Sequence, residues 1–274
     1  MSQVTLVHST PNGDDLVAYM ARVSNPDNQN NTETSDRLIK YLIKHKHWSP
    51  FEMVNMCVEI KTTRSIAAQI LRHRSFSFQE FSQRYAQVNE RPVVPDIRRQ
   101  DVFNRQNSTD DMDPFTVQEF QLKANQLFDQ ALYLYNEMLC AGVAKECARE
   151  VLPLSTPSTL YMNGTLRSWI HYTDLRCGNG TQYEHKVIAD ACRKLIEQCF
   201  PKVYAALSWY YFLTMTQSEV LEQFNTSWAL AEKHVPALVG SNYMKRRGWE
   251  LFVADLLANS SITQDQFDHL TNPF

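Results

Sequence analysis

Glycine is scarce in this sequence. Only 7 of the 274 residues are glycine, well below the roughly 7% of average usage. The single G-x-G triplet is Gly178-Asn179-Gly180, and Tyr183 stands where the dinucleotide fingerprint requires a third glycine. A phosphate loop of the G-x-x-x-x-G-K-S/T type is also missing. A nucleotide bound by this chain would therefore be held by arginines and helix ends.

Three further absences narrow the class of protein. No apolar stretch approaches the roughly 18 residues that a membrane span needs, so we expect no membrane partner. The charges nearly balance, with 27 Lys and Arg against 30 Asp and Glu, which argues against a nucleic-acid partner. The six cysteines form no C-x-x-C pair and the N-terminus lacks a signal-peptide pattern, so we expect a reduced, cytoplasmic protein.

The hydrophobic periodicity predicts a helix-rich α+β protein. The clearest strand begins at Val54, where apolar residues alternate with polar ones as far as Lys61. A second strand is expected at residues 2–8, and helical segments are expected at 20–24, 34–47, 65–71, 117–141, 164–175, 182–199 and 201–215. Strands and helices do not alternate regularly, so a parallel sheet is not expected. We interpret 1–218 as the main domain and 219–274 as a helical C-terminal extension packed on it.

Residues 89–114 are rich in proline and polar residues, which favours a long loop. The helix beyond it carries Val117, Ala124, Ala131 and Met138 at one heptad position. Phe120, Leu127, Leu134 and Ala141 occupy a second position, so the helix has a narrow apolar seam. This seam fits either a core-facing helix, which is the more common case and the one that we favour, or an oligomer interface.

The segment from Arg72 to Tyr85 concentrates side chains that carry chemistry. Its sequence is Arg-His-Arg-Ser-Phe-Ser-Phe-Gln-Glu-Phe-Ser-Gln-Arg-Tyr. Arginine forks bind phosphate through paired hydrogen bonds, so three of them indicate a phosphate-bearing ligand. A solvated basic helix end is the simpler alternative, but the interleaved aromatic residues indicate partial burial.

This segment resembles the signature of the flavin-dependent thymidylate synthases, in which Arg-His-Arg is followed after seven residues by Ser, here Ser82. Four other segments match the same family in order: 21–24, 47–52, 148–153 and 166–176. Together they cover about residues 20–185. Gln79 departs from the usual asparagine of the family pattern.

The resemblance implies the function and the assembly. It implies reductive methylation of dUMP to dTMP, with 5,10-methylenetetrahydrofolate as carbon donor and NADPH-reduced FAD as hydride source. It also implies an antiparallel sheet flanked by helices, in a homotetramer whose active sites are shared between subunits.

The resemblance also assigns the site residues. FAD would be contacted by His47, Ser49, His73, Arg74, Glu80, Thr165, Arg167 and His171. The substrate would be bound by Gln69, Arg72, Glu80, Ser82, Gln83, Arg84, Arg149 and Arg176, and Arg176 would be the catalytic residue at the pyrimidine. A guanidinium suits that role because it stays charged while negative charge develops on the ring.

Alternative readings of these residues are weaker. Ser82 has no His or Lys base beside it in the motif, which favours substrate binding over nucleophilic attack. None of the six cysteines has a Pro-Cys-His setting for cysteine-based thymidylate synthesis. His45 and His47, two residues apart, do not share a helix face, so no metal site is expected. The remaining alternative is a single-stranded nucleic-acid-binding module built on the basic and aromatic run from Arg72 to Arg99.

Overall fold

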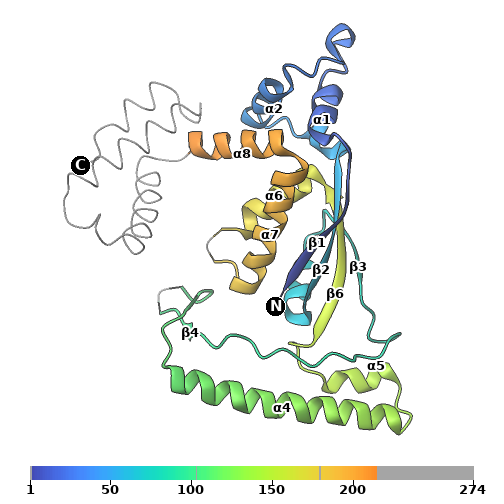
Figure 1. Ribbon diagram of the computed structural model, residues 1–274, viewed down its shortest axis with the longest axis vertical. Coiled ribbons are helices and arrows are strands. Elements are labelled where there is room, and N and C mark those ends of the chain that lie inside the picture. The colour runs from blue at the N-terminus through green and yellow to red at the C-terminus, as the bar shows by residue number, and fades with distance from the viewer. Residues whose placement is uncertain (1, 103, 179, 215–274) are drawn as a thin grey trace, which may run out of the picture. The chain divides into compact units, whose positions relative to one another are not determined.

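The computed structural model describes residues 2–102, 104–178 and 180–214 (Figure 1). The described residues fall into two compact units, one containing residues 2–21 and 49–199 and the other containing residues 22–48 and 200–214. The boundary expected at 218 and the extension 219–274 lie outside the described residues. Within the described part, no helix combines the length and the apolar character needed to cross a membrane.

The first unit contains the sheet. Its strands are β1 (Gln3–Ser9), β2 (Asn55–Thr63), β3 (Ser77–Glu80), β4 (Arg99–Gln100), β5 (Ser108–Thr109) and β6 (Pro157–Thr165). Its α-helices are α1 (Gly13–Ala21), α3 (Arg64–Ile70), α4 (Pro114–Cys140), α5 (Lys145–Ala148), α6 (Leu166–Arg176) and α7 (Tyr183–Cys199). Two 3-10 helices complete it, η2 (Ser49–Met53) and η3 (Arg149–Val151). The expected α+β class is confirmed.

The main sheet has the strand order β1-β2-β6-β3, and every neighbouring pair is antiparallel. This confirms the antiparallel sheet. The alternation read from the sequence of β2 is real: Met56, Val58 and Ile60 are fully buried. Val58 lies opposite Met162 of β6, which is also fully buried. The centre of the sheet is therefore an apolar layer built from two long strands.

Helices α6 and α7 pack together along this sheet (Figure 1). Trp169 of α6 is fully buried, and its indole Nε1 donates a hydrogen bond to the carbonyl of Met56 at 2.8 Å. That bond satisfies the one polar atom of a large buried side chain and fixes α6 against β2. Thr165 caps α6 by accepting a bond from the backbone N of Ser168 at 3.3 Å, so residue 165 ends β6 and the helix begins at 166.

Helix α4 is longer than any other helix described, but it contributes little to the core. Of its described side chains only Tyr135 is buried. The seam residues Phe120, Leu127 and Leu134 are between 44% and 61% exposed. The other row of the seam is half-buried, and its Met138 packs against the buried cluster of Val88, Tyr135 and Ala148. Within the described residues, the interpretation of α4 as a core-facing helix therefore holds for one row of the seam and not for the other.

The second unit pairs α2 (Ser35–Lys44) with α8 (Pro201–Thr214), and η1 (Pro26–Asn28) precedes α2. The helix expected to reach residue 47 ends at Lys44, and Lys46 adopts a left-handed backbone with φ of 56°. The helical stretch expected through residue 24 likewise ends at Ala21.

Candidate functional site

The turn after α3, residues 71–76, carries the Arg-His-Arg triplet and lies against α6. Ser168 of α6 donates a hydrogen bond from its hydroxyl to the carbonyl of Ser75 at 3.2 Å. The ring of Phe76 packs edge-on against Trp169, with ring centroids 4.8 Å apart. The buried face of α6 therefore fixes the course of the turn.

Phe76 depends on a glycine in the neighbouring strand. A Cβ atom on Gly164 of β6 would lie only 2.4 Å from a ring carbon of Phe76. Real Cβ atoms essentially never approach another atom so closely. The absence of a side chain at 164 thus makes room for the aromatic residue that anchors the turn.

His73 and Arg176 are joined directly. Nε of Arg176, at the end of α6, donates to Nε2 of His73 at 2.9 Å. An arginine has no acceptor, so Nε2 of His73 must be unprotonated and its proton must lie on Nδ1. Burial, together with the positive charge of Arg176, lowers the pKa of His73 to about 4. The imidazole is therefore neutral near pH 7.

A second histidine lies behind this pair. His185 of α7 is fully buried, and its Nε2 lies 3.2 Å from the hydroxyl of Tyr172. Its Nδ1 lies 3.3 Å from Oε1 of Gln69, which is a residue assigned to the substrate. Burial lowers the pKa of His185 to about 4 and raises that of Tyr172 above its ordinary value. The sequence offered no signal for Tyr172 or His185, since each is recognisable only from tertiary contacts.

The two residues at the start of α6 that the resemblance assigns to FAD share a carboxylate. Thr165 donates its hydroxyl to Oε2 of Glu52 at 2.7 Å, and a terminal nitrogen of Arg167 donates to Oε1 at 2.8 Å. Glu52 lies in η2, whose first residue is Ser49. Glu52 has no role assigned to it from the sequence, although it belongs to the matched segment 47–52. It connects two separate family segments.

Ser82 and Arg84 line a cavity of about 390 Å³ together with Lys145 and Glu146. Nε of Arg84 forms an ion pair with Oε2 of Glu146 at 3.0 Å, and both side chains are more than half exposed. Arg149 begins η3 and pairs with the adjacent Glu150 at 3.2 Å. The structure thus brings together two residues of the predicted substrate set.

The remaining assigned residues have varied surroundings. Arg72 and Arg74 are exposed, and neither has an ion pair among the residues described. Glu80 accepts a hydrogen bond from Ser158 at 2.8 Å. Gln83 is 3% exposed, and its buried Nε2 has no partner within the described residues, so its side chain does not line the cavity.

Among the described residues, no hydrogen bond joins the side chain of His171 or His47 to the side chains above. His171 is exposed on α6, and its charged form would lower the pKa of His73. His47 belongs to the second unit, where its ring meets that of Tyr41 edge-on at 5.9 Å.

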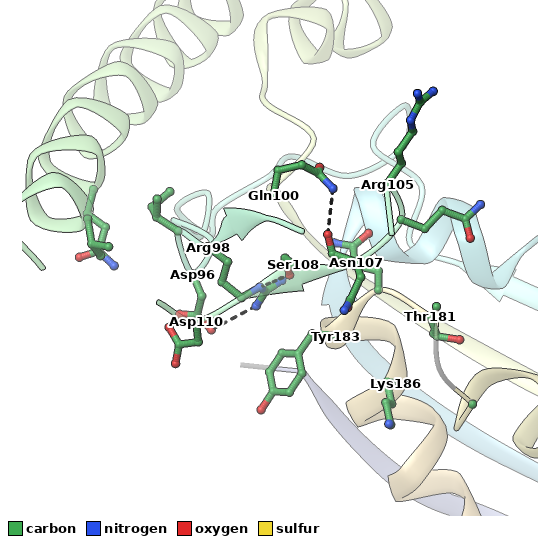
Figure 2. A pocket seen from close by; sticks show the side chains of 17 residues that line it. Asp96, Arg98, Gln100, Arg105, Asn107, Ser108, Asp110, Thr181, Tyr183 and Lys186 are labelled. Atoms are coloured by element: carbon green, nitrogen blue, oxygen red, sulfur yellow. Dashed lines mark hydrogen bonds and ion pairs between the residues drawn. The ribbon is translucent and has the colours of Figure 1, made fainter. Parts of the chain in front are cut away.

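The proline-rich stretch 89–114 is not wholly irregular, because β4 and β5 pair within it as a short antiparallel hairpin. A cavity of about 860 Å³ lies between this hairpin and the start of α7. Figure 2 shows Arg98 and Ser108 facing it from the hairpin, with Tyr183 and Lys186 on α7. Its lining includes none of the residues that the resemblance assigns to a ligand.

Comparison with known proteins gives a consistent result. A family model described as "thymidylate synthase complementing protein" matches residues 5–202. The chain is 52% identical over 204 residues to a probable flavin-dependent thymidylate synthase of Paramecium bursaria Chlorella virus 1, covering 74% of this chain and 94% of that protein. It is 53% identical over 194 residues to a flavin-dependent thymidylate synthase of Synechocystis, covering 71% and 89%.

A solved structure also matches. The UMP/dUMP methylase PolB of Streptomyces cacaoi, bound with 5-Br dUMP, superposes with a TM-score of 0.69 at 28% identity. The match covers 75% of this chain and 94% of that one.

Proposed function

The chain belongs to the flavin-dependent thymidylate synthases, and from this premise we propose that it converts dUMP to dTMP with FAD, 5,10-methylenetetrahydrofolate and NADPH. It is a methyltransferase enzyme that acts on dUMP. Flavin is the cofactor of the family, and we propose 5,10-methylenetetrahydrofolate and NADPH as the co-substrates.

The observation that carries the proposal is the pairing of Arg176 with a neutral histidine. Addition at C6 of the uracil ring places negative charge on C5 and on the C4 oxygen, so a fixed cation beside the ring lowers the barrier. His73 occupies only Nε of Arg176. The two terminal nitrogens therefore stay available to donate to the pyrimidine, and their direction is set before substrate arrives.

The cavity beside Ser82 suits the phosphate of dUMP. It offers the guanidinium of Arg84, the ammonium of Lys145 and a hydroxyl. A phosphate entering it would compete with Glu146 for Arg84, and both partners are exposed, so their ion pair is easily exchanged. Arg149 would add a second fork to the same ligand.

The donor set near the turn fits FAD. Exposed Arg74 supplies a cation for its diphosphate, and Arg167 and Thr165 present a further guanidinium and a hydroxyl at the start of α6. Bound FAD, once reduced, would supply the hydride. The further residues that remain proposed contacts to this cofactor are His47, Ser49, His73, Glu80 and His171. Those that remain proposed contacts to dUMP are Gln69, Arg72 and Gln83.

We also propose the homotetramer with shared active sites. Support comes from α4, where Phe120, Leu127 and Leu134 are exposed in the part of the chain that the structure describes. Light scattering tests the assembly: a monomer at micromolar concentration would remove the basis for shared sites.

All six cysteines are unpaired, which suits a reducing compartment and supports the proposal of a cytoplasmic protein.

The central experiment measures dTMP formation with FAD, NADPH and methylenetetrahydrofolate. The protein should be yellow when purified or after FAD is added. Arg176→Ala should keep the flavin spectrum and lose dTMP formation, and Arg176→Lys should recover little because a point charge cannot replace the fork. Arg99→Ala is the matched control, since Arg99 pairs only with Asp111 in the hairpin. Normal turnover in Arg176→Ala would refute the assigned role.

The nucleic-acid-binding alternative finds no support in the comparisons. Its basic run is divided in the structure between the turn at α6, strand β3 and the hairpin, where Arg98 and Arg99 form ion pairs. A binding assay with single-stranded DNA should show no saturable binding at physiological salt.

A further inference from the structure

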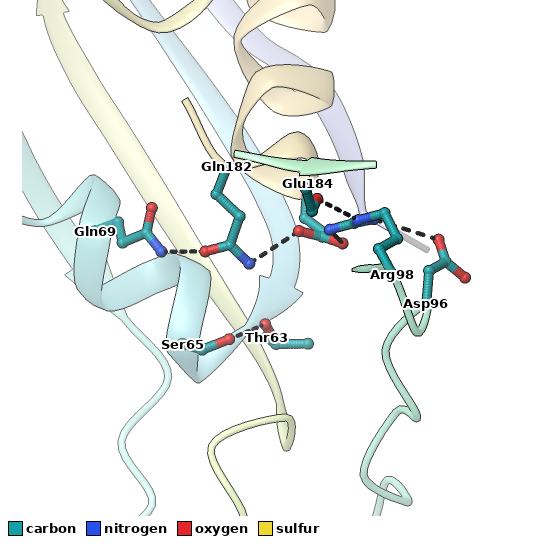
Figure 3. Close-up of polar contacts among 8 residues, drawn as sticks. Thr63, Ser65, Gln69, Asp96, Arg98, Gln182 and Glu184 are labelled. Carbon is teal, nitrogen blue, oxygen red and sulfur yellow. Dashed lines mark hydrogen bonds and ion pairs between the residues drawn. The ribbon is translucent and has the colours of Figure 1, made fainter. Parts of the chain in front are cut away.

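A continuous series of hydrogen bonds runs from the hairpin to Gln69 (Figure 3). A terminal nitrogen of Arg98 donates to Oε1 of Glu184 at 2.6 Å. Nε2 of Gln182 donates to Oε2 of the same carboxylate at 2.9 Å. Nε2 of Gln69 donates to Oε1 of Gln182 at 2.7 Å. Oε1 of Gln69 then faces His185, so five side chains from three elements are linked in sequence.

Donors and acceptors follow a single order along this series of hydrogen bonds, and Glu184 determines that order. An amide side chain can turn over and exchange its donor and acceptor ends, but an ionised carboxylate only accepts. Burial alone would raise the pKa of Glu184, yet hydrogen bonds from its own backbone, Gln182 and Arg98 lower it. Glu184 therefore holds Gln182 with its NH₂ toward the carboxylate. The oxygen of Gln182 must then face Gln69.

The same logic continues inward. With its NH₂ turned to Gln182, Gln69 presents its oxygen to His185, so Nδ1 of His185 carries the proton. Nε2 of His185 then accepts from the hydroxyl of Tyr172. Tyr172 packs edge-on against His73 at 4.9 Å between ring centroids, which brings the series to the partner of Arg176.

Gln69 keeps hydrogen-bonding capacity for a ligand. Its amide has two N–H donors and two lone pairs, and the contacts to Gln182 and His185 use one of each. The side chain is partly exposed. A ligand thus meets a donor and an acceptor whose positions would be exchanged if the amide turned over.

We infer that Glu184 is a positioning residue for dUMP, acting through Gln182 to fix which end of the Gln69 amide meets the substrate. This rests on the proposed function, in which Gln69 contacts dUMP. Arg98 contributes by holding Glu184 from the hairpin, which gives a role to a segment outside the resemblance. In this proposal Glu184 itself does not contact dUMP and acts only through Gln182 and Gln69.

The test is a graded series at position 184, with dUMP binding to the FAD-loaded protein measured by calorimetry. Glu184→Asp keeps the acceptor and should bind nearly as the unsubstituted protein does. Glu184→Gln allows both amide orientations, and equal populations would weaken dUMP binding about twofold. Glu184→Lys presents a donor, forces the reversed orientation and should weaken it by about tenfold or more. At saturating dUMP, kcat should change little.

Two controls separate positioning from general damage. Asp111→Lys breaks a separate arginine–carboxylate pair of the hairpin, the one with Arg99, and should leave dUMP binding unchanged. In a Gln69→Ala background, Glu184→Lys should add no further loss, because its route to the substrate is gone.

Each outcome is decisive. Unchanged dUMP binding in Glu184→Lys, an equal loss in the Gln69→Ala background, or normal binding by Gln69→Ala itself would overturn the inference. None of these results depends on dTMP formation by the unsubstituted protein. If that protein formed no dTMP, the proposed function would be refuted instead.

Discussion

Replacing Gly164 by alanine should damage both the fold and the site. Ordinary contact begins at 3.4 Å, and a Cβ at 164 would lie 2.4 Å from the Phe76 ring, so the ring would have to retreat by about 1 Å. It has little space to do so. Phe76 is 9% exposed and packs against Trp169 and Tyr172, with ring centroids at 4.8 and 5.9 Å.

Overpacking of this kind lowers the free energy of unfolding by about 1–3 kcal/mol. In a chain of this size the melting temperature falls by about 2–4 °C for each kcal/mol. Displacement of the ring would also move the turn that carries His73, so kcat for dTMP formation should fall as well. Differential scanning calorimetry and the dTMP assay measure the two effects.

Gly178→Ala is the matched control, because a Cβ there would meet nothing closer than the carbonyl of Leu175 at 3.6 Å. It should melt like the unsubstituted protein. Phe76→Leu removes part of the ring, so its effect and that of Gly164→Ala should be less than additive in the double variant. A Gly164→Ala protein as stable and active as the Gly178→Ala protein would refute this reasoning.

Three other expectations follow from single contacts. Tyr135→Phe leaves the buried backbone N–H of Val88 without its acceptor, 3.0 Å away, and should cost about 1–3 kcal/mol of unfolding free energy in chemical denaturation; an unchanged midpoint would contradict this. Glu146→Gln releases Arg84 and should tighten dUMP binding by up to about fivefold in calorimetry, and weaker binding would argue against a phosphate at this cavity. Burial lowers the pKa of His185 to about 4, so the unfolded chain binds the extra proton between pH 4 and its ordinary pKa near 6.5. The stability from neutral His185 is therefore complete above pH 6.5 and lost as the pH falls toward 4. His185→Gln should flatten that part of the melting-temperature profile, and an identical slope would exclude the histidine.

The sequence predicts those elements in which the alternation of apolar and polar residues matches the burial of their side chains. Strand β2 alternates because its apolar side chains fill the core, and this periodicity is local. Strand β6 was missed because Pro157, Asn163 and Gly164 disfavour strands when read alone. It forms because β2 and β3 pair with it on both sides, and glycine stands at 164 because Phe76 packs against that position. Those reasons are tertiary.

The site divides in the same way. The family segments identified Arg176 and His73, but their direct hydrogen bond could not be read from residues 103 positions apart. The apolar seam of α4 was visible, yet sequence periodicity does not show whether the covering layer comes from the same chain. The network through Glu184 and Gln182 was invisible, because each residue is an ordinary polar side chain until the hairpin and α7 meet.

The histidine that holds Arg176 favours activity over stability. A carboxylate at position 73 would anchor the guanidinium more firmly, but it would also cancel the charge. The imidazole fixes the direction of Arg176, which makes no ion pair among the residues described, and leaves its charge intact. Selection for thermostability alone would favour an acidic residue there. We therefore expect variants recovered only for heat resistance to lose activity first at this contact.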